Sequence, residues 1–238
     1  MNSTTNEPFL HNRISFRQNA AAAHPLYCTG YIAVPQLDIT YFLNSINTFF
    51  ITGYPRSRSA WLANWLSDDW RICLHDELVN HATLESFADA IQDHPVTGVS
   101  DSALALFWKP LMQMFPEAKW LVVMRDRADA EAATIKSLTD DPLPGCGAPE
   151  AIHLKDFFDR SQRALVALCE APNVLTVRFD ELDSQIVAEN IWRHIVGQGI
   201  FPLRRWKMLK ALRITQIASK RTVNLPNIRA LAATLPHE

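Results

Sequence analysis

The chain has 238 residues, of which 48% are hydrophobic and 20% charged, so it can bury a core and carries too little charge for a disordered protein. Its 23 basic and 25 acidic residues give a formal net charge of −2, which argues against general affinity for nucleic acid or an anionic membrane. No apolar run approaches the ~18 residues of a membrane-spanning helix, and no secretory signal is visible. We therefore expect a cytoplasmic protein with one large domain, or one domain and an extension.

The order of the elements predicts the fold. Residues 1–46 are read as an N-terminal extension that packs on the domain, and residues 47–238 as the domain itself. Expected strands cover residues 48–52, 70–74, 95–99, 119–124 and 174–179, and expected helices cover 60–66, 84–91, 103–115, 128–138, 154–170 and most of the chain from 186. Strands that alternate with helices are typical of βαβ crossovers, so we predict an α/β fold of three layers with a mainly parallel central sheet.

Ligands of such sheets bind beyond the carboxyl ends of the strands, so the residues after each strand are candidates for a site. The first such segment is GYPRSRS, residues 53–59, which we call the anion loop. A turn from a strand into a helix directs backbone N–H groups and a helix N-terminus at one point, which suits phosphate or sulfate. Arg56 adds a cation and Ser57 and Ser59 add hydroxyls. The alternative is a plain serine N-cap with both loop arginines solvated.

Glycine is scarce, at seven residues, so Gly53 in front of this turn is expected to be required by the backbone.

The anion loop is not a Walker A motif. Counted from Gly53, Arg58 stands where that motif has its second glycine, and Ser59 where it has lysine.

The segment TGYPRSRSAWL resembles the 5′-phosphosulfate-binding loop of sulfotransferases that use 3′-phosphoadenosine 5′-phosphosulfate (PAPS), whose pattern is approximately YPKSGTTWL. Two later segments, FPEAKWLVVMRD and NVLTVRFDEL, resemble strands of the same family, and residues 191–201 resemble one of its helices. The resemblance covers residues 48–201. Arg58 in place of glycine and Ala60 in place of the second threonine depart from the pattern.

The resemblance implies a P-loop NTPase-like fold and transfer of a sulfuryl group from PAPS to a hydroxyl or amine of a small molecule or glycan, without a metal. The cofactor-binding residues implied by it are Gly53, Pro55, Arg56, Ser57, Arg58, Ser59, Ala60, Trp61, Arg125 and Thr134. Arg56, Ser57 and Ser59 would hold the 5′-phosphosulfate, and Trp61 would lie near the adenine.

Arg125 matches the family's arginine for the 3′-phosphate, and its alternative is a pairing with Asp126 or Asp129. The family's serine eight residues later is Ala133 here. Either Thr134 or Ser137 substitutes for it, or the 3′-phosphate is not recognised.

Sulfuryl transfer also needs a general base that takes the proton of the acceptor. The candidates are His75, Asp76 and Glu77 after the second strand and Asp101 after the third. The ordinary pKa of histidine, ~6.5, suits His75, whereas a carboxylate would need burial to raise its pKa. The alternative for His75 is an exposed residue at a strand end.

Other groups give weaker signals. His81 and His94 are read as surface residues, and a basic helix near the C-terminus offers Lys220 or Arg221 to a phosphate. The eight histidines and four cysteines show no metal-ligand spacing.

Two other functions stay open. A P-loop nucleotide kinase would keep the fold but lacks the Walker lysine, and a catalytically degenerate binding scaffold would explain Arg58, Ala60 and Ala133. The sequence does not specify the acceptor or the oligomeric state.

Overall fold

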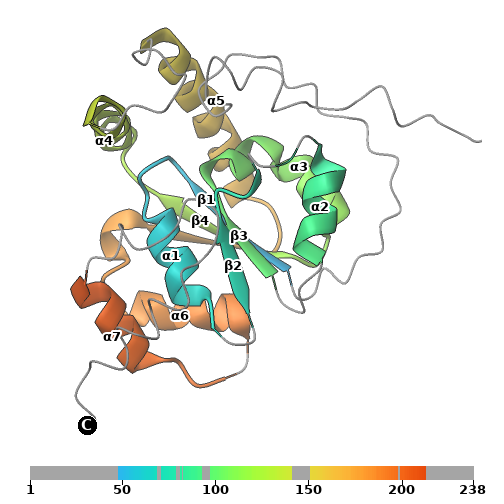
Figure 1. Ribbon diagram of the computed structural model, residues 1–238, viewed down its shortest axis with the longest axis vertical. Helices are drawn as coiled ribbons and strands as arrows, with labels where there is room; N and C mark the ends of the chain where they lie inside the picture. The colour runs from blue at the N-terminus through green and yellow to red at the C-terminus, as the bar shows by residue number, and fades with distance from the viewer. Residues whose placement is uncertain are drawn as a thin grey trace, which may run out of the picture.

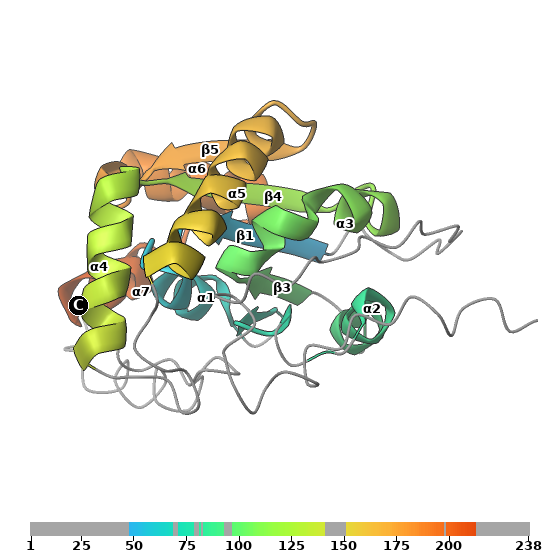
Figure 2. The ribbon, with the colours of Figure 1, turned by 90° about the horizontal axis from the view of Figure 1, so that it is seen from above.

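The computed structural model describes residues 48–68, 71–78, 81, 83–92, 97–140, 151–197 and 199–212, with only the backbone at 92, 151–153 and 212. Residues 1–46, His94, Lys220 and Arg221 lie outside the described residues. Within these ranges a central sheet separates two layers of helices (Figures 1 and 2). No helix in the described ranges is long and apolar enough to span a bilayer.

The sheet has five strands, all parallel, in the order β2-β3-β1-β4-β5. They are β1 (Thr48–Gly53), β2 (Ile72–His75), β3 (Thr97–Ser100), β4 (Lys119–Met124) and β5 (Val174–Arg178). Each falls on a strand expected from the sequence, so the α/β fold with a mainly parallel sheet is confirmed. For β1, the apolar run without charges over residues 48–52 predicted a strand because a parallel sheet is covered on both faces.

The helical elements are α1 (Ser59–Leu66), α2 (Leu84–Gln92), η4 (Ser102–Phe107), α3 (Trp108–Met114), α4 (Arg127–Asp140), α5 (Ala151–Cys169), η5 (Phe179–Glu181), α6 (Gln185–Val196) and α7 (Leu203–Leu212). The single helix expected over 103–115 is wrong, because the segment divides into the 3₁₀ helix η4 and the α-helix α3. Pro110 explains the division. It has no N–H to donate, and it is accommodated in the first turn of α3, where no intrahelical acceptor is needed.

Alternating side chains of each strand face the two layers. Phe50 and Trp120 belong to a core under α2, α3 and α5, whereas Phe49 and Leu121 belong to a second core under α1, α6 and α7.

Two glycines allow close approach within the sheet. A Cβ on Gly53 would lie 2.5 Å from the carbonyl oxygen of Val123, and one on Gly98 would meet the Phe49 ring at 2.0 Å. Glycine is therefore required at Gly53 by the neighbouring backbone and at Gly98 by the buried ring of Phe49.

Candidate functional site

The carboxyl ends of β1, β2, β3 and β4 bring the candidate residues to one edge of the sheet. From β1 the chain passes to β2, beyond β3, and it later returns to β4 on the other side of β1. The end of β1 is therefore a topological switch point, where open α/β sheets bind their ligands. The anion loop begins there.

The anion loop has an unusual backbone. Arg56 has φ 64° and Arg58 has φ 62°, in the left-handed region that non-glycine residues rarely adopt. Arg58 is also the N-cap of α1 and makes no side-chain capping hydrogen bond. Residues held in such a conformation need support from their surroundings and concentrate at functional sites.

Three contacts from distant segments supply that support. Arg58 forms a two-point ion pair with Asp183, at 2.8 and 3.2 Å. Arg125 donates to the carbonyl oxygen of Arg56 over 2.5 Å, and Ser100 donates its hydroxyl to the carbonyl of Ser59 over 2.9 Å. The anion loop is thus tied to β3, to β4 and to the turn before α6. The alternative in which Arg58 is merely solvated is wrong.

The aromatic ring of Phe179, directly after β5, contacts two of these arginines. The guanidinium of Arg125 is 4.4 Å from the ring centroid and that of Arg58 is 5.4 Å away. Guanidinium groups at such distances are attracted to the ring face, which holds both side chains in place. Arg56, by contrast, is exposed.

Ser57 is the buried hydroxyl of the anion loop. Its side chain is 3% exposed, and among the described residues its Oγ has no hydrogen-bond partner. Buried polar groups are nearly always hydrogen-bonded, so an unpartnered hydroxyl in a loop of this kind indicates a place for a ligand oxygen.

A hollow of about 440 Å³ opens beside the anion loop and is lined by Arg56, Arg125, Ala133, Lys136, Ser137 and Asp140. Three cationic side chains face a single carboxylate there, so the hollow favours an anionic ligand. We call it the cationic hollow.

His75 lies on the other side of the anion loop. Its Nε2 is 3.1 Å from Ser59 Oγ and 3.4 Å from Asp76 Oδ1, and its side chain is 12% exposed. Burial lowers the pKa of His75, and the nearby Asp101 carboxylate partly offsets this shift. An ordinary exposed strand-end histidine is therefore not what the structure contains.

Asp101 is fully buried at the end of β3. One carboxylate oxygen accepts from the N–H of Ala103 at 2.8 Å and caps η4, whereas Oδ2 has no partner among the described residues. Burial and the neighbouring charge of Asp76 raise the pKa of Asp101 to about 7. Ser59, His75 and Asp101 thus form one polar cluster against the anion loop, in which Asp101 is buried and the other two are half-buried.

No protein-family model matches the chain, and no curated protein matches it in sequence. Among solved structures, the chain is similar to mouse sulfotransferase SULT7A1 complexed with PAP, with a TM-score of 0.53 and 15% identity over 76% of this chain and 73% of that one. The chain has a sulfotransferase-like fold. A sulfotransferase from Alicyclobacillus acidocaldarius is also similar, with a TM-score of 0.45 and 14% identity over 80% of this chain and 96% of that one.

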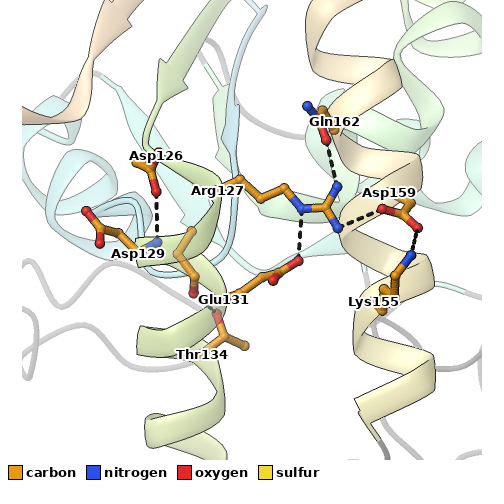
Figure 3. A network of polar contacts seen from close by, with 9 residues as sticks. Asp126, Arg127, Asp129, Glu131, Thr134, Lys155, Asp159 and Gln162 are labelled. Carbon is orange, nitrogen blue, oxygen red and sulfur yellow. Dashed lines mark hydrogen bonds and ion pairs between the residues drawn. The ribbon is translucent and has the colours of Figure 1, made fainter.

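In this sulfotransferase-like fold, helix α4 is fixed to α5 by the side chain of Arg127. Its guanidinium binds Glu131 at 2.9 Å, Asp159 at 2.6 Å and Gln162 at 2.6 Å, as Figure 3 shows. At the start of α4, Asp126 accepts from the N–H of Asp129. The face of α4 that meets the cationic hollow is therefore held by a rigid network.

Thr134 does not lie in the cationic hollow. It is 1% exposed, and its hydroxyl donates to the carbonyl of Ala130 at 2.7 Å within the same helix. Residues lining the hollow recur at helical spacing, and Thr134 points to another side of α4. Of the two substitutes considered from the sequence, the structure brings Ser137 to the site and turns Thr134 into the core.

Two further candidates have structural surroundings that differ from the expectation. Trp61 is 3% exposed and donates its Nε1–H to the carbonyl of Leu209, so it joins α1 to α7 in the core and is not presented to a nucleotide. Glu77 pairs with His81 at 2.9 Å, and both side chains are mostly buried. His81 is therefore not a surface residue, and Glu77 is directed to it.

The remaining residues of the anion loop shape the turn. Gly53 and Pro55 are buried, and Ala60 is half-buried in the first turn of α1, where its carbonyl accepts from Asn64.

The described residues contain no group of three or more His, Cys, Asp or Glu that could hold a metal.

Sequence reasoning missed Lys136, Asp140, Phe179 and Asp183. For the first two a signal was present, because they stand three and seven residues after Ala133 and so share its helix face. For Phe179 and Asp183 there was none, since their partner Arg58 is more than a hundred residues away.

Proposed function

We propose that this protein is a sulfotransferase that moves a sulfuryl group from PAPS to a hydroxyl or amine of a small molecule or glycan. One observation carries the proposal: His75 Nε2 lies 3.1 Å from the hydroxyl of Ser59 in the anion loop. A candidate base and a candidate anion site thus adjoin each other, as a group transfer requires.

The residues of the site fit PAPS. The unpartnered Ser57 hydroxyl, the N-terminus of α1 and the guanidinium of Arg56 would hold the 5′-phosphosulfate. Arg125 stands at the cationic hollow for a second anionic group of the nucleotide. The mouse sulfotransferase of similar fold is complexed with PAP, which supports the same nucleotide class here.

PAPS, when bound, supplies the activated sulfuryl group. Arg56 offsets negative charge on the leaving phosphate. His75 takes the proton of the acceptor. Its lowered pKa keeps the imidazole neutral at pH 7 and so able to accept that proton. Asp101, buried beside it, stabilises the imidazolium that forms.

The test is calorimetric titration with adenosine 3′,5′-bisphosphate (PAP) and, separately, ATP with magnesium. We expect metal-independent binding of PAP that Arg56→Ala abolishes. The matched control is Arg178→Ala, since Arg178 is exposed and pairs only with Asp180 in the described structure. Preference for ATP with magnesium would favour the kinase, and binding of neither nucleotide would favour the scaffold.

If PAP binds, transfer is assayed with PAPS labelled in the sulfuryl group against a panel of phenols, alcohols, amines and glycans. Turnover of any acceptor that His75→Ala abolishes while PAP binding persists supports the enzyme. Binding of PAP without turnover of any acceptor would favour a nucleotide-binding scaffold.

A further inference from the structure

The anion loop holds two hydroxyls in different surroundings. Ser57 Oγ is buried and has no partner among the described residues, whereas Ser59 Oγ lies 3.1 Å from Nε2 of His75. A hydroxyl without a partner is available to a ligand oxygen, but a hydroxyl beside a neutral imidazole can also give up its proton. Of these two serines, only Ser59 has a base at hydrogen-bond distance in the described structure.

The surroundings of His75 favour a ring that accepts at Nε2. Burial lowers the pKa of His75, so the imidazole is neutral at pH 7 and carries its proton on one nitrogen. The other nitrogen, Nδ1, is buried without a partner in the described ranges, and so is Oδ2 of Asp101, whose charge acts on His75. A proton on Nδ1 would satisfy both buried groups, directly or through one water, and leave Nε2 to accept from Ser59.

Asp76 is placed to stabilise the charge that follows. Its Oδ1 lies 3.4 Å from the same Nε2 of His75, so a proton taken from Ser59 would come to lie beside a carboxylate. Asp76 has φ 52°, in the left-handed region that non-glycine residues rarely adopt and that concentrates at functional sites. Ser59 is the first residue of α1, where the positive end of the helix favours a partly ionised oxygen. A nucleophile, its base and a carboxylate that supports the base thus lie together.

We propose that the hydroxyl of Ser59 is a nucleophile that takes the sulfuryl group from PAPS before the acceptor does, so that the reaction passes through a sulfated Ser59. The inference rests on the proposed function and adds a covalent step to it. Ser59 is the last residue of the anion loop, so a sulfuryl group held by that loop would be in contact with its hydroxyl.

The atoms balance in two half-reactions. In the first, Ser59 Oγ forms a bond to sulfur, the bond from sulfur to the 5′-phosphate oxygen breaks with its electron pair on that oxygen, and the serine proton moves to Nε2 of His75. This proton passes to water when PAP leaves. In the second, the acceptor oxygen or nitrogen bonds to sulfur, the bond from sulfur to Oγ breaks, and the acceptor proton passes through His75 to Oγ.

The first experiment incubates the full chain with PAPS labelled in the sulfuryl group and with no acceptor. We expect label at the peptide that carries Ser59, located by mass spectrometry, and release of PAP in an amount equal to the protein. Ser59→Ala should abolish both, and His75→Asn should slow both by about 10²-fold or more. An acceptor from the panel that is turned over should then remove the label. Turnover that leaves the label in place would show a dead-end modification and overturn the inference.

A second measurement needs no PAPS. Phenylmethanesulfonyl fluoride offers an electrophilic sulfur to activated serines, so it should modify Ser59 in the wild type and not in His75→Asn. Equal modification of both proteins, or of neither, would overturn the role of His75 as the base of Ser59.

The matched control is Ser86→Ala, which removes a half-buried hydroxyl that hydrogen-bonds to the backbone of Thr83. It should leave labelling by both reagents unchanged. If PAP binds but PAPS leaves Ser59 unlabelled, the inference is wrong while the proposed function stands. If the wild-type protein binds no PAP, both are overturned.

Discussion

Arg125 donates a hydrogen bond from its guanidinium to the backbone carbonyl of Arg56, over 2.5 Å, and thereby joins the end of β4 to the turn after β1. The acceptor belongs to a residue with φ 64°, so the bond stabilises a backbone that would otherwise be unfavourable. The same guanidinium stacks on Phe179 and lines the cationic hollow. Arg125 therefore both stabilises the conformation of the anion loop and contributes positive charge to the site.

Replacement of Arg125 by alanine should affect folding and binding together. We expect Arg125→Ala to lower the free energy of unfolding by about 1 kcal/mol, through the lost hydrogen bond and cation–π contact, and to remove most nucleotide affinity. Urea unfolding and calorimetry measure the two effects. Arg178→Ala, which removes an arginine from the end of the neighbouring strand, should change neither. Lost affinity with unchanged stability would mean that Arg125 contributes charge alone.

His75 should matter for turnover and not for nucleotide affinity. Because the imidazole touches Ser59 and would take the acceptor proton, we expect His75→Asn to lower kcat by about 10²–10⁴ while the dissociation constant of PAP changes little. The control is His81→Asn, another half-buried histidine paired with a carboxylate, which should keep kcat near the wild-type value. An equal loss of kcat and PAP affinity would instead make His75 a structural support of the anion loop.

The sheet could be predicted from the sequence because its strands are short apolar runs that end at turn residues. KWLVVM and VLTVR lie in β4 and β5 as expected. The division of residues 102–114 into η4 and α3 could not be predicted from apolar periodicity, since both halves are equally apolar. Pro110 indicated only that a continuous helix is disturbed near this position. Because proline is tolerated in the first turn of a helix, as in α3, its position did not specify where η4 ends and α3 begins.

The site was predicted where it depends on strand ends and missed where it depends on helix rotation. His75 is the last residue of β2, and Asp101 and Arg125 directly follow β3 and β4, so their convergence on the anion loop follows from topology. Whether Thr134 or Ser137 faces the cationic hollow depends on how α4 is turned against its neighbours, and in the structure α4 buries the face that carries Ala130, Thr134 and Leu138. One residue along a helix is a rotation of about 100°, which periodicity in a weakly amphipathic helix does not fix.

The buried carboxyl of Asp101 predicts a pH dependence of stability. Its pKa rises from 3.8 to about 7 on folding, so the folded state binds the proton more tightly than the unfolded state. The resulting stabilisation is complete below the unfolded value and is lost as the pH rises through about 7. We therefore expect the wild type to lose free energy of unfolding relative to Asp101→Asn between about pH 4 and pH 8, by 1 kcal/mol or more.

Asparagine suits this comparison because it keeps an oxygen that can accept from the N–H of Ala103 and carries no charge at any of these pH values. Burial lowers the pKa of His75, which destabilises the fold at acid pH in both proteins, and the Asp101 carboxylate partly offsets this shift only in the wild type. Urea unfolding at several pH values measures the difference. A difference that is constant with pH would show that Asp101 does not titrate in this range.

Arg58 stands where the sulfotransferase loop pattern has glycine, and the structure gives the physical reason for that position. At φ 62° an L side chain costs about 1 kcal/mol, and Arg58 offsets this with its ion pair to Asp183 and its contact with Phe179. Arg58→Gly removes both the contacts and the strain, whereas Arg58→Ala removes only the contacts. We expect the glycine variant to be more stable than the alanine variant by about 1 kcal/mol in urea unfolding.

The same pair of substitutions at Arg178 is the control, because that residue has φ −83°, where alanine is at least as favourable as glycine. There the order should reverse, with Arg178→Ala the more stable variant. If glycine and alanine are equal at Arg58, its left-handed backbone carries no strain. The contribution of Arg58 to stability then comes from its contacts with Asp183 and Phe179 alone, and Asp183→Asn should cost less than Arg58→Ala, because it leaves the contact with Phe179 in place.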